Sequence, residues 1–126
     1  MPKILIVDDE THIRRLLEET LEEFEEKGVE IFTAKNGKEA VEIIVKEEPN
    51  LIFLDVMMPE MNGYDVCKII KKEYCIKNIF IIMLTAKGQE FDKKKGLEVG
   101  VDMYITKPFD PDFIISNTEK VLGIKL

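Results

Sequence analysis

The sequence predicts a doubly wound α/β fold, in which five parallel strands in the order 2-1-3-4-5 are covered by five helices. Strand-like and helix-like segments alternate five times along the 126 residues, a pattern typical of α/β proteins. Three of the strand-like segments are continuous apolar runs, as expected for parallel strands covered on both faces. Right-handed crossovers leave few arrangements for such a chain, and 2-1-3-4-5 is the common order for five strands.

Hydrophobic patterns place the five strands. Segments 4–7, 51–54 and 79–84 are apolar throughout and are expected at the centre of the sheet. Segment 29–34 alternates apolar and polar residues, and segment 101–106 is mixed. We therefore expect these two strands to be more peripheral.

The helices are expected between the strands. The first is indicated by apolar residues at helical spacing, with Gly28 as its end: Ile13, Leu16, Leu17, Leu21 and Phe24. Glycine or proline near most boundaries places the other four: residues 37–47, 63–73, 89–99 and 110–122.

Length and composition narrow the class of protein. A chain of 126 residues suits one domain with a sizeable core, so residues 1–126 are expected to form a single domain. No apolar run approaches the roughly 20 residues of a membrane helix, and the N-terminus lacks the pattern of a secretory signal. We expect a soluble, cytoplasmic protein with no membrane partner.

Charge and cysteine content exclude further classes. A net charge of −7 argues against direct nucleic-acid binding, because phosphate backbones attract clustered Lys and Arg. Any effect on DNA should need another chain. One cysteine pair in a chain with a full core is not typical of a disulfide scaffold. Cys67 and Cys75 are therefore expected to be free thiols.

Polar residues directly follow four of the predicted strands: Asp8 and Asp9 the first, Asp55 the third, Thr85 the fourth and Lys107 the fifth. Because the carboxyl ends of parallel strands share one edge, these side chains are expected to converge. Three adjacent carboxylates repel one another, so either their pKa values rise or a cation neutralises them. A bound metal is the simpler solution. The oxygen donors favour Mg²⁺, with Mn²⁺ as the alternative.

This combination of groups suits phosphoryl transfer. A carboxylate beside a divalent ion, a hydroxyl and an ammonium can accept a phosphoryl group while the cations stabilise its oxygens. Asp55 is assigned as the nucleophile. Lys107 can follow a phosphoryl oxygen on its flexible stem, and Thr85 can donate its hydroxyl to another.

Four motifs resemble the receiver domains of two-component response regulators, the CheY-like family. They are ILIVDDE at 4–10, DVMMPEMNG at 55–63, LTA at 84–86 and YITKPF at 104–109. The resemblance extends over essentially the whole chain. It implies that a sensor histidine kinase phosphorylates Asp55 in a Mg²⁺-dependent reaction. It also implies a phosphoacceptor switch, not a conventional enzyme, that takes part in its own phosphorylation and autodephosphorylation.

The same resemblance implies roles for individual residues. Asp9 and Asp55 would bind Mg²⁺ directly, Asp8 would act mainly through a water, and the main-chain carbonyl of Met57 would be a further ligand. Thr85 would move toward the phosphoryl group while Tyr104 swings inward.

The Lys107–Pro108 peptide bond would be cis in this family. Met57 and Lys87 stand where the family tunes the lifetime of the phosphoryl group.

The implied output is a changed surface over segments 89–99, 101–106 and 110–122. This surface would signal to a downstream protein or to an output domain outside the sequence, with phosphorylation-dependent dimerisation as an alternative. The chain is accordingly either a stand-alone receiver or a fragment of a longer regulator.

Other interpretations remain open for the same residues. A flavodoxin-like cofactor binder would share the fold, but Asp8 and Asp9 would repel a flavin phosphate. An aspartyl phosphatase of the haloacid dehalogenase type would expect a second Asp where Met57 stands. A third alternative is a receiver-like interaction module that is not phosphorylated. Taken singly, Asp8 or Asp9 could cap a helix, and Tyr104 could be an ordinary strand aromatic.

Overall fold

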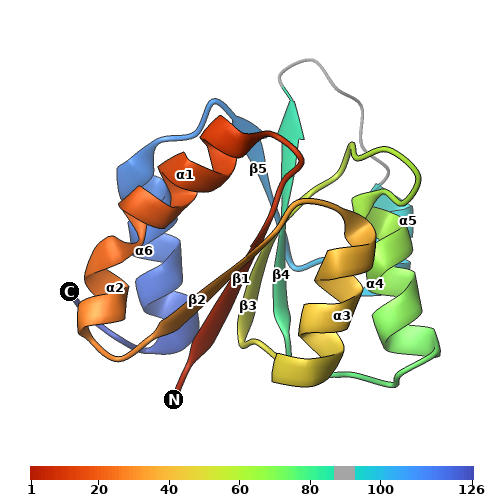
Figure 1. Ribbon diagram of the computed structural model, residues 1–126, viewed down its shortest axis with the longest axis horizontal. Helices are drawn as coiled ribbons and strands as arrows, with labels where there is room; N and C mark the ends of the chain where they lie inside the picture. Colours follow the sequence, from red (N-terminus) through yellow and green to blue (C-terminus); the bar gives the residue numbers. More distant parts are fainter. Residues whose placement is uncertain (87–92) are drawn as a thin grey trace.

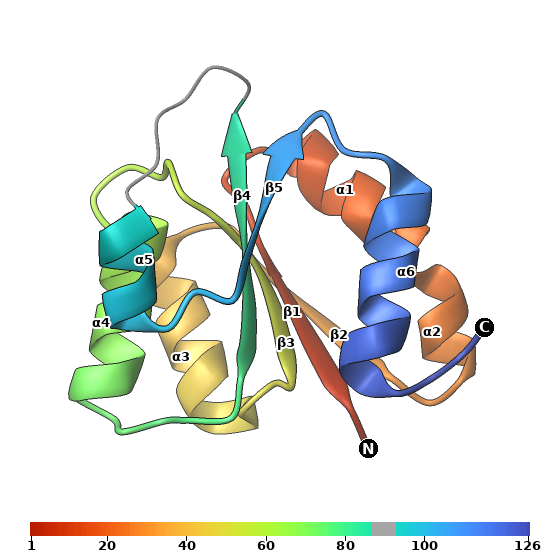
Figure 2. The ribbon, with the colours of Figure 1, turned by 180° about the vertical axis from the view of Figure 1, so that it is seen from behind.

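Five parallel strands form one sheet in the order β2-β1-β3-β4-β5 (Figures 1 and 2). The structure, a computed structural model, describes residues 1–86 and 93–126. Fold class and strand order agree with the prediction, and the three apolar runs form central strands. The strands are β1 (Lys3–Val7), β2 (Glu30–Ala34), β3 (Leu51–Asp55), β4 (Phe80–Ala86) and β5 (Met103–Lys107).

The register of the strands brings their carboxyl ends to one edge. Val7 pairs with Leu54, and Asp55 pairs with Leu84 on the next strand. Ala86 in turn pairs with Lys107. The carboxyl ends of β1, β3, β4 and β5 therefore lie along the same edge of the sheet.

Helices cover both faces of the sheet (Figures 1 and 2). Helices α1, α2 and α6 lie on one face, and α3, α4 and α5 lie on the other. Their bounds are α1 (Thr11–Thr20), α2 (Glu22–Glu26), α3 (Gly37–Glu47), α4 (Gly63–Lys72), α5 (Lys93–Val99) and α6 (Pro111–Leu122). The predicted start of the fourth helix at Gln89 lies outside the described residues.

The predicted count of five helices is wrong, because the first predicted helix is two. At Leu21 the backbone leaves helical values, with φ −97° and ψ 4°. Thr20 donates its hydroxyl to the carbonyl of Leu16 at 2.7 Å, a bond that commonly bends helices. Leu17 and Phe24 are fully buried on either side of the break. The expected apolar face therefore survives the bend, except that Leu16 is exposed.

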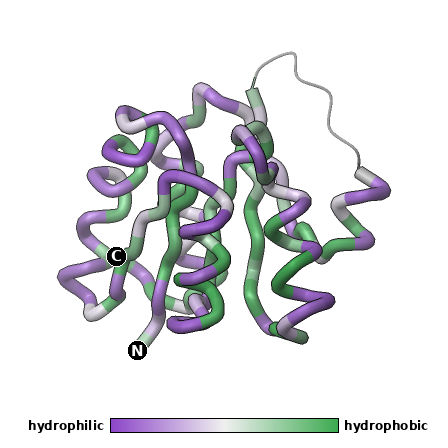
Figure 3. The backbone as a smooth tube through the Cα atoms, turned by 45° about the vertical axis from the view of Figure 1, so that its right-hand side comes forward, coloured by the Kyte–Doolittle hydropathy of each residue, from purple (hydrophilic) through white to green (hydrophobic). Residues whose placement is uncertain are grey.

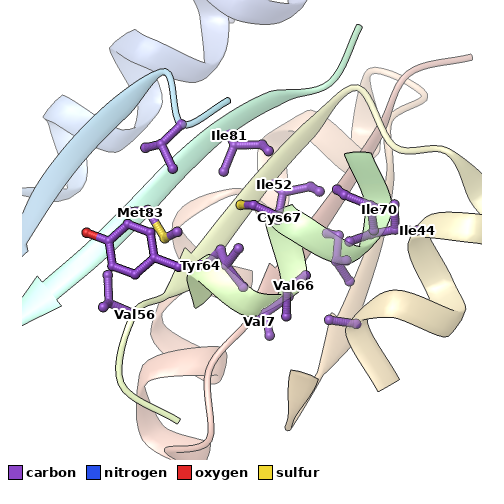
Figure 4. Packing of buried hydrophobic residues seen from close by; sticks show 14 of the residues in the cluster. Val7, Ile44, Ile52, Val56, Tyr64, Val66, Cys67, Ile70, Ile81 and Met83 are labelled. Carbon is purple, nitrogen blue, oxygen red and sulfur yellow. The ribbon is translucent and has the colours of Figure 1, made fainter. Parts of the chain in front are cut away.

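Two hydrophobic clusters fill the space between the sheet and its helices. Hydrophobic residues are concentrated on the strands, while the helices alternate between hydrophobic and hydrophilic (Figure 3). In the cluster under α3 and α4, side chains from the strands meet side chains from the helices (Figure 4), among them Val7, Ile52, Met83, Ile44, Val66, Cys67 and Ile70. The second cluster packs against α1, α2 and α6. Because the two clusters bury both faces of the sheet, the central strands contain continuous apolar runs.

None of the helices within the described ranges has both the length and the apolar character needed to cross a bilayer. Cys67 and Cys75 are free, as predicted, with Cys67 buried and Cys75 exposed.

Candidate functional site

Three carboxylates meet at the carboxyl end of the sheet, as the sequence predicts. One oxygen from each of Asp8, Asp9 and Asp55 lies within 4.8 Å of the other two. Asp8 and Asp55 are buried, with 0% and 3% of their surface exposed, whereas Asp9 is exposed. Two shielded acidic groups thus stand beside a third that is open to solvent.

Lys107 supplies the cation in this cluster. Its Nζ lies 3.1 Å from Asp8 Oδ2 and 3.5 Å from Asp55 Oδ1. The Lys107–Pro108 peptide bond at the end of β5 is cis, as the resemblance implies. Among the described residues, one ammonium therefore contacts two of the three carboxylates, which leaves an excess of negative charge.

Burial and the close approach of these charges shift the pKa values of Asp55 and Lys107. Burial, and next the charge of Asp8, raise the pKa of Asp55 to about 7. A hydrogen bond with Asp9 raises this pKa further. Two groups lower it: the charge of Lys107 and the Met57 N–H, which lies 3.2 Å from Asp55 Oδ1. Burial lowers the pKa of Lys107, but the hydrogen bond to Asp8 and the Asp55 charge outweigh burial, so this pKa is raised.

Hydrogen bonds fix the loop that carries Asp8. Its Oδ1 accepts the Glu10 N–H at 2.9 Å, and its main-chain carbonyl accepts Arg14 Nη1 at 2.7 Å. Arg14 also donates to the Thr11 hydroxyl at 3.3 Å. Arg14 is not among the site residues that the sequence predicts. Its position in the first turn of α1, four residues after the last acidic residue of segment 8–10, is the signal that could have found it.

Hydrogen bonds also fix the loop after Asp55. Val56 donates its N–H to the Leu84 carbonyl at 3.1 Å and accepts the Gly63 N–H at 3.0 Å. A Cβ on Gly63 would lie 2.8 Å from the Asp55 carbonyl oxygen, so the first turn of α4 approaches the backbone of Asp55 too closely for a side chain. Asn62 and Asp65 form a capping box at this turn, which fixes where α4 begins.

The two residues predicted to switch occupy neighbouring strands. Thr85 is buried near the end of β4, one residue beyond the partner of Asp55. Tyr104 is partly buried on β5, and its hydroxyl lies 3.2 Å from the hydroxyl of Tyr64. Met57 is 65% exposed in the loop beside Asp55. Lys87 lies outside the described residues.

The donor set fits a hard divalent cation. All three side chains contribute carboxylate oxygens, which suit Mg²⁺ and not the softer metals that prefer sulfur or imidazole. A cation would also offset the charge that the single ammonium of Lys107 leaves unbalanced.

Sequence comparisons agree with the geometry. Residues 4–119 match the family described as the response regulator receiver domain. The chain is 48% identical over 120 residues to the probable transcriptional regulator ycf27 of Porphyra purpurea. It is 46% identical over 121 residues to the alkaline phosphatase synthesis transcriptional regulatory protein PhoP of Bacillus subtilis (strain 168). Each alignment covers 95% of this chain but 47% and 48% of those proteins. The chain thus spans about half the length of these curated relatives.

Solved structures give the same result. A response regulator receiver domain protein (CheY-like) from Methanospirillum hungatei JF-1 superposes with a TM-score of 0.82 at 34% identity, covering 97% of this chain and 94% of that one. The chemotaxis protein CheY4 of Vibrio cholerae gives a TM-score of 0.82 at 33% identity, covering 96% and 98%. With the family match and the convergent acidic site, these likenesses identify the chain as a member of the response regulator receiver domain family of two-component signalling, whose members are phosphoacceptor switches and not classical enzymes.

Proposed function

We propose that the chain accepts a phosphoryl group on Asp55 from a sensor histidine kinase, with Mg²⁺ bound at the carboxylate cluster. The observation that carries this proposal is the meeting of Asp8, Asp9 and Asp55 within 4.8 Å, with the Lys107 ammonium in contact with two of them. Such a site combines a nucleophile with the positive charge that phosphoryl transfer requires.

In the proposed step, a carboxylate oxygen of Asp55 attacks the phosphorus of a kinase phosphohistidine. The new P–O bond forms as the P–N bond breaks, and the leaving imidazole takes the electron pair. Asp55 must be ionised to attack, although burial and Asp8 raise its pKa to about 7. The Lys107 ammonium stabilises the transferred oxygens and opposes this rise in pKa.

The residues that would hold Mg²⁺ are Asp9, Asp55 and the main-chain carbonyl of Met57, with Asp8 acting through a water. Bound there, the ion supplies the positive charge that neutralises the carboxylates and the phosphoryl oxygens. Release of the phosphoryl group to water at the same site would return Asp55 to its starting state.

The proposed output is a change in the surface formed by α5, β5 and α6, the segments that the sequence places at 89–99, 101–106 and 110–122. Thr85 would move toward the phosphoryl group, and Tyr104 would turn inward. The changed surface would signal to a downstream protein, to an output domain, or through phosphorylation-dependent dimerisation. The relatives named as transcriptional regulators support an output domain.

The acidic net charge of −7 supports a chain that does not itself contact nucleic acid. Response regulators typically act in the cytoplasm, which is the proposed location.

Intact-mass spectrometry after incubation with acetyl phosphate tests the proposal. The wild type should gain one labile phosphoryl adduct in Mg²⁺ and none in EDTA. Asp55→Asn should gain none in either condition. Asp112→Asn, an exposed carboxylate on α6, is the matched control and should be labelled like the wild type. A folded wild type that gains no adduct would instead indicate an unphosphorylated interaction module.

A further inference from the structure

Tyr104 makes a contact that lies outside the phosphoacceptor site. Its hydroxyl is 3.2 Å from that of Tyr64, within hydrogen-bonding distance, with either oxygen able to donate. Tyr64 is the second residue of α4 and is 6% exposed. Its ring belongs to the cluster under α3 and α4, and its hydroxyl points to the outer side of that cluster, away from Val66 and Ile70 (Figure 4).

Gly96 on α5 leaves the space that the Tyr104 phenol occupies. A Cβ built on Gly96 would overlap the Tyr104 hydroxyl and lie 3.1 Å from its Cζ. The φ of Gly96 is not in the left-handed region, so its backbone does not require glycine. Glycine is a poor residue for a helix interior. Space for the phenol therefore explains its presence.

A third contact joins α4 and α5 at the same place. The ammonium of Lys95 lies 5.3 Å from the centroid of the Tyr64 ring, a distance at which a cation is attracted to an aromatic face. Lys95 therefore links α5 to the same Tyr64 ring whose hydroxyl meets Tyr104. The Tyr104 phenol itself lies between the Tyr64 hydroxyl on α4 and the backbone of Gly96 on α5.

We infer that Tyr64 and Gly96 are positioning residues for the switch, which hold Tyr104 in its partly buried position between α4 and α5. Gly96 gives the phenol room, and Tyr64 receives its hydroxyl. This role rests on the proposed function, in which the inward turn of Tyr104 carries the phosphorylation signal. The Tyr64 hydroxyl then sets how strongly the Tyr104 ring is held in this position before any phosphoryl group arrives.

NMR of protein labelled with ¹³C in the tyrosine rings tests this inference, because the chain has only three tyrosines. Without phosphodonor, Tyr64→Phe should shift the Tyr104 ring resonance away from its wild-type position. The ratio of Tyr104 rings held against Tyr64 to rings that have left this position should fall about fivefold, the effect of losing one net hydrogen bond. Tyr74→Phe removes an exposed hydroxyl and should leave Tyr104 unmoved. A Tyr104 resonance that is the same in wild type and Tyr64→Phe would overturn the role of Tyr64.

A double-mutant cycle tests Gly96. Gly96→Ala should displace the Tyr104 ring and lower the thermal midpoint, since the new methyl group overlaps the phenol. In a Tyr104→Ala background, the same substitution should no longer lower the midpoint, because the obstructing ring is absent. Equal losses in both backgrounds would overturn the role of Gly96.

These measurements fail independently of the proposed function. They use unphosphorylated protein, so they read the tyrosine contact even if Asp55 gains no adduct. Conversely, Asp55 could gain the adduct while the Tyr104 resonance does not change in Tyr64→Phe. That result would preserve the phosphoacceptor and overturn the positioning role of Tyr64.

Discussion

Lys107 Nζ lies 3.1 Å from Asp8 Oδ2, although 99 residues separate the two in sequence. Lys107 ends β5 and Asp8 follows β1, and β3 and β4 lie between these strands in the sheet. The lysine side chain therefore reaches over the end of the sheet and contacts Asp55 on the way, at 3.5 Å. Because it is the cation contacting two buried carboxylates, its removal should affect both stability and signalling.

Lys107→Ala should destabilise the metal-free protein by about 3 kcal/mol, because buried charges would lose their partner. Urea denaturation at pH 7 in EDTA measures this loss. Lys3→Ala is the matched control, since the Lys3–Glu47 ion pair is also short, at 3.0 Å, but partly exposed. The control should lose much less. Similar losses in the two variants would show that burial of the Lys107 pairs contributes nothing.

The same Lys107→Ala variant should still be phosphorylated slowly by acetyl phosphate, while its conformational response weakens, because the phosphoryl group loses its partner. The change in the Tyr104 ring resonance on phosphorylation measures that response. A response as large as that of the wild type would remove Lys107 from the switch.

Asp55→Asn should change how stability depends on pH. The pKa of Asp55 is raised from an ordinary 3.8 to about 7 by burial and by Asp8, with Lys107 opposing and Asp9 adding to the rise. Its stabilising contribution is therefore fully present below about pH 4 and is lost as the pH rises through 7. The uncharged amide that Asp55→Asn introduces avoids this loss.

The measured quantity is the free energy of unfolding of Asp55→Asn minus that of the wild type. This difference should be larger at pH 8 than at pH 5, by on the order of 2 kcal/mol. Urea denaturation at both pH values, in EDTA, gives the comparison. A difference between variant and wild type that does not change with pH would contradict the raised pKa.

Much of the site could be predicted because each residue stands at or directly after the carboxyl end of a strand. Asp8, Asp55 and Lys107 lie far apart in sequence, yet a parallel sheet brings strand ends together whatever the intervening segments are. The helix break at Leu21 could not be predicted in this way. Leu17 and Phe24 keep helical spacing across it, so the hydrophobic pattern contains no sign of the bend.

Contacts between helices were also beyond the sequence pattern. Tyr64 reads as one more apolar residue on the buried face of α4, and nothing local indicates that its hydroxyl meets Tyr104. Gly96 reads as an ordinary small helix residue until the position of the Tyr104 phenol is known. Such pairs depend on how α4 and α5 pack, which spacing along either helix alone does not determine.

The two cysteines should differ sharply in reactivity. Cys67 is fully buried, and burial is the main cause that raises the pKa of its thiol to about 12. Because the thiolate is the reactive form, Cys67 should be inert near pH 8. A disulfide reagent such as Ellman's should therefore detect one thiol in the folded protein and two in denaturant. Cys75→Ser should leave none in the folded state, and rapid labelling of that variant would contradict the burial of Cys67.

Gly63→Ala should disturb the phosphoacceptor through its backbone. The added methyl group would lie 2.8 Å from the Asp55 carbonyl oxygen, which the strand holds in place. We expect a loss of about 1–3 kcal/mol in unfolding free energy and slower phosphorylation of Asp55. Gly37→Ala is the control, because Gly37 also follows an Asn cap at the start of a helix. The three atoms nearest its methyl group would be side-chain atoms of Met61 and not backbone atoms, so it should cost less. Equal losses would remove the close approach to Asp55 as the cause.

Mg²⁺ should stabilise the wild type through the three carboxylates, since a ligand that binds only the folded state raises the free energy of unfolding. At about ten times its dissociation constant, Mg²⁺ adds about 1.4 kcal/mol, which corresponds to a rise of about 5 °C in thermal midpoint for a chain of this size. Asp9→Asn should abolish most of this rise with little change in the metal-free midpoint, because Asp9 is exposed and lies at the open side of the cluster. Asp112→Asn should keep the full rise. Thermal scans in EDTA and in Mg²⁺ measure all three proteins, and an undiminished rise in Asp9→Asn would remove Asp9 from the ligands of the ion.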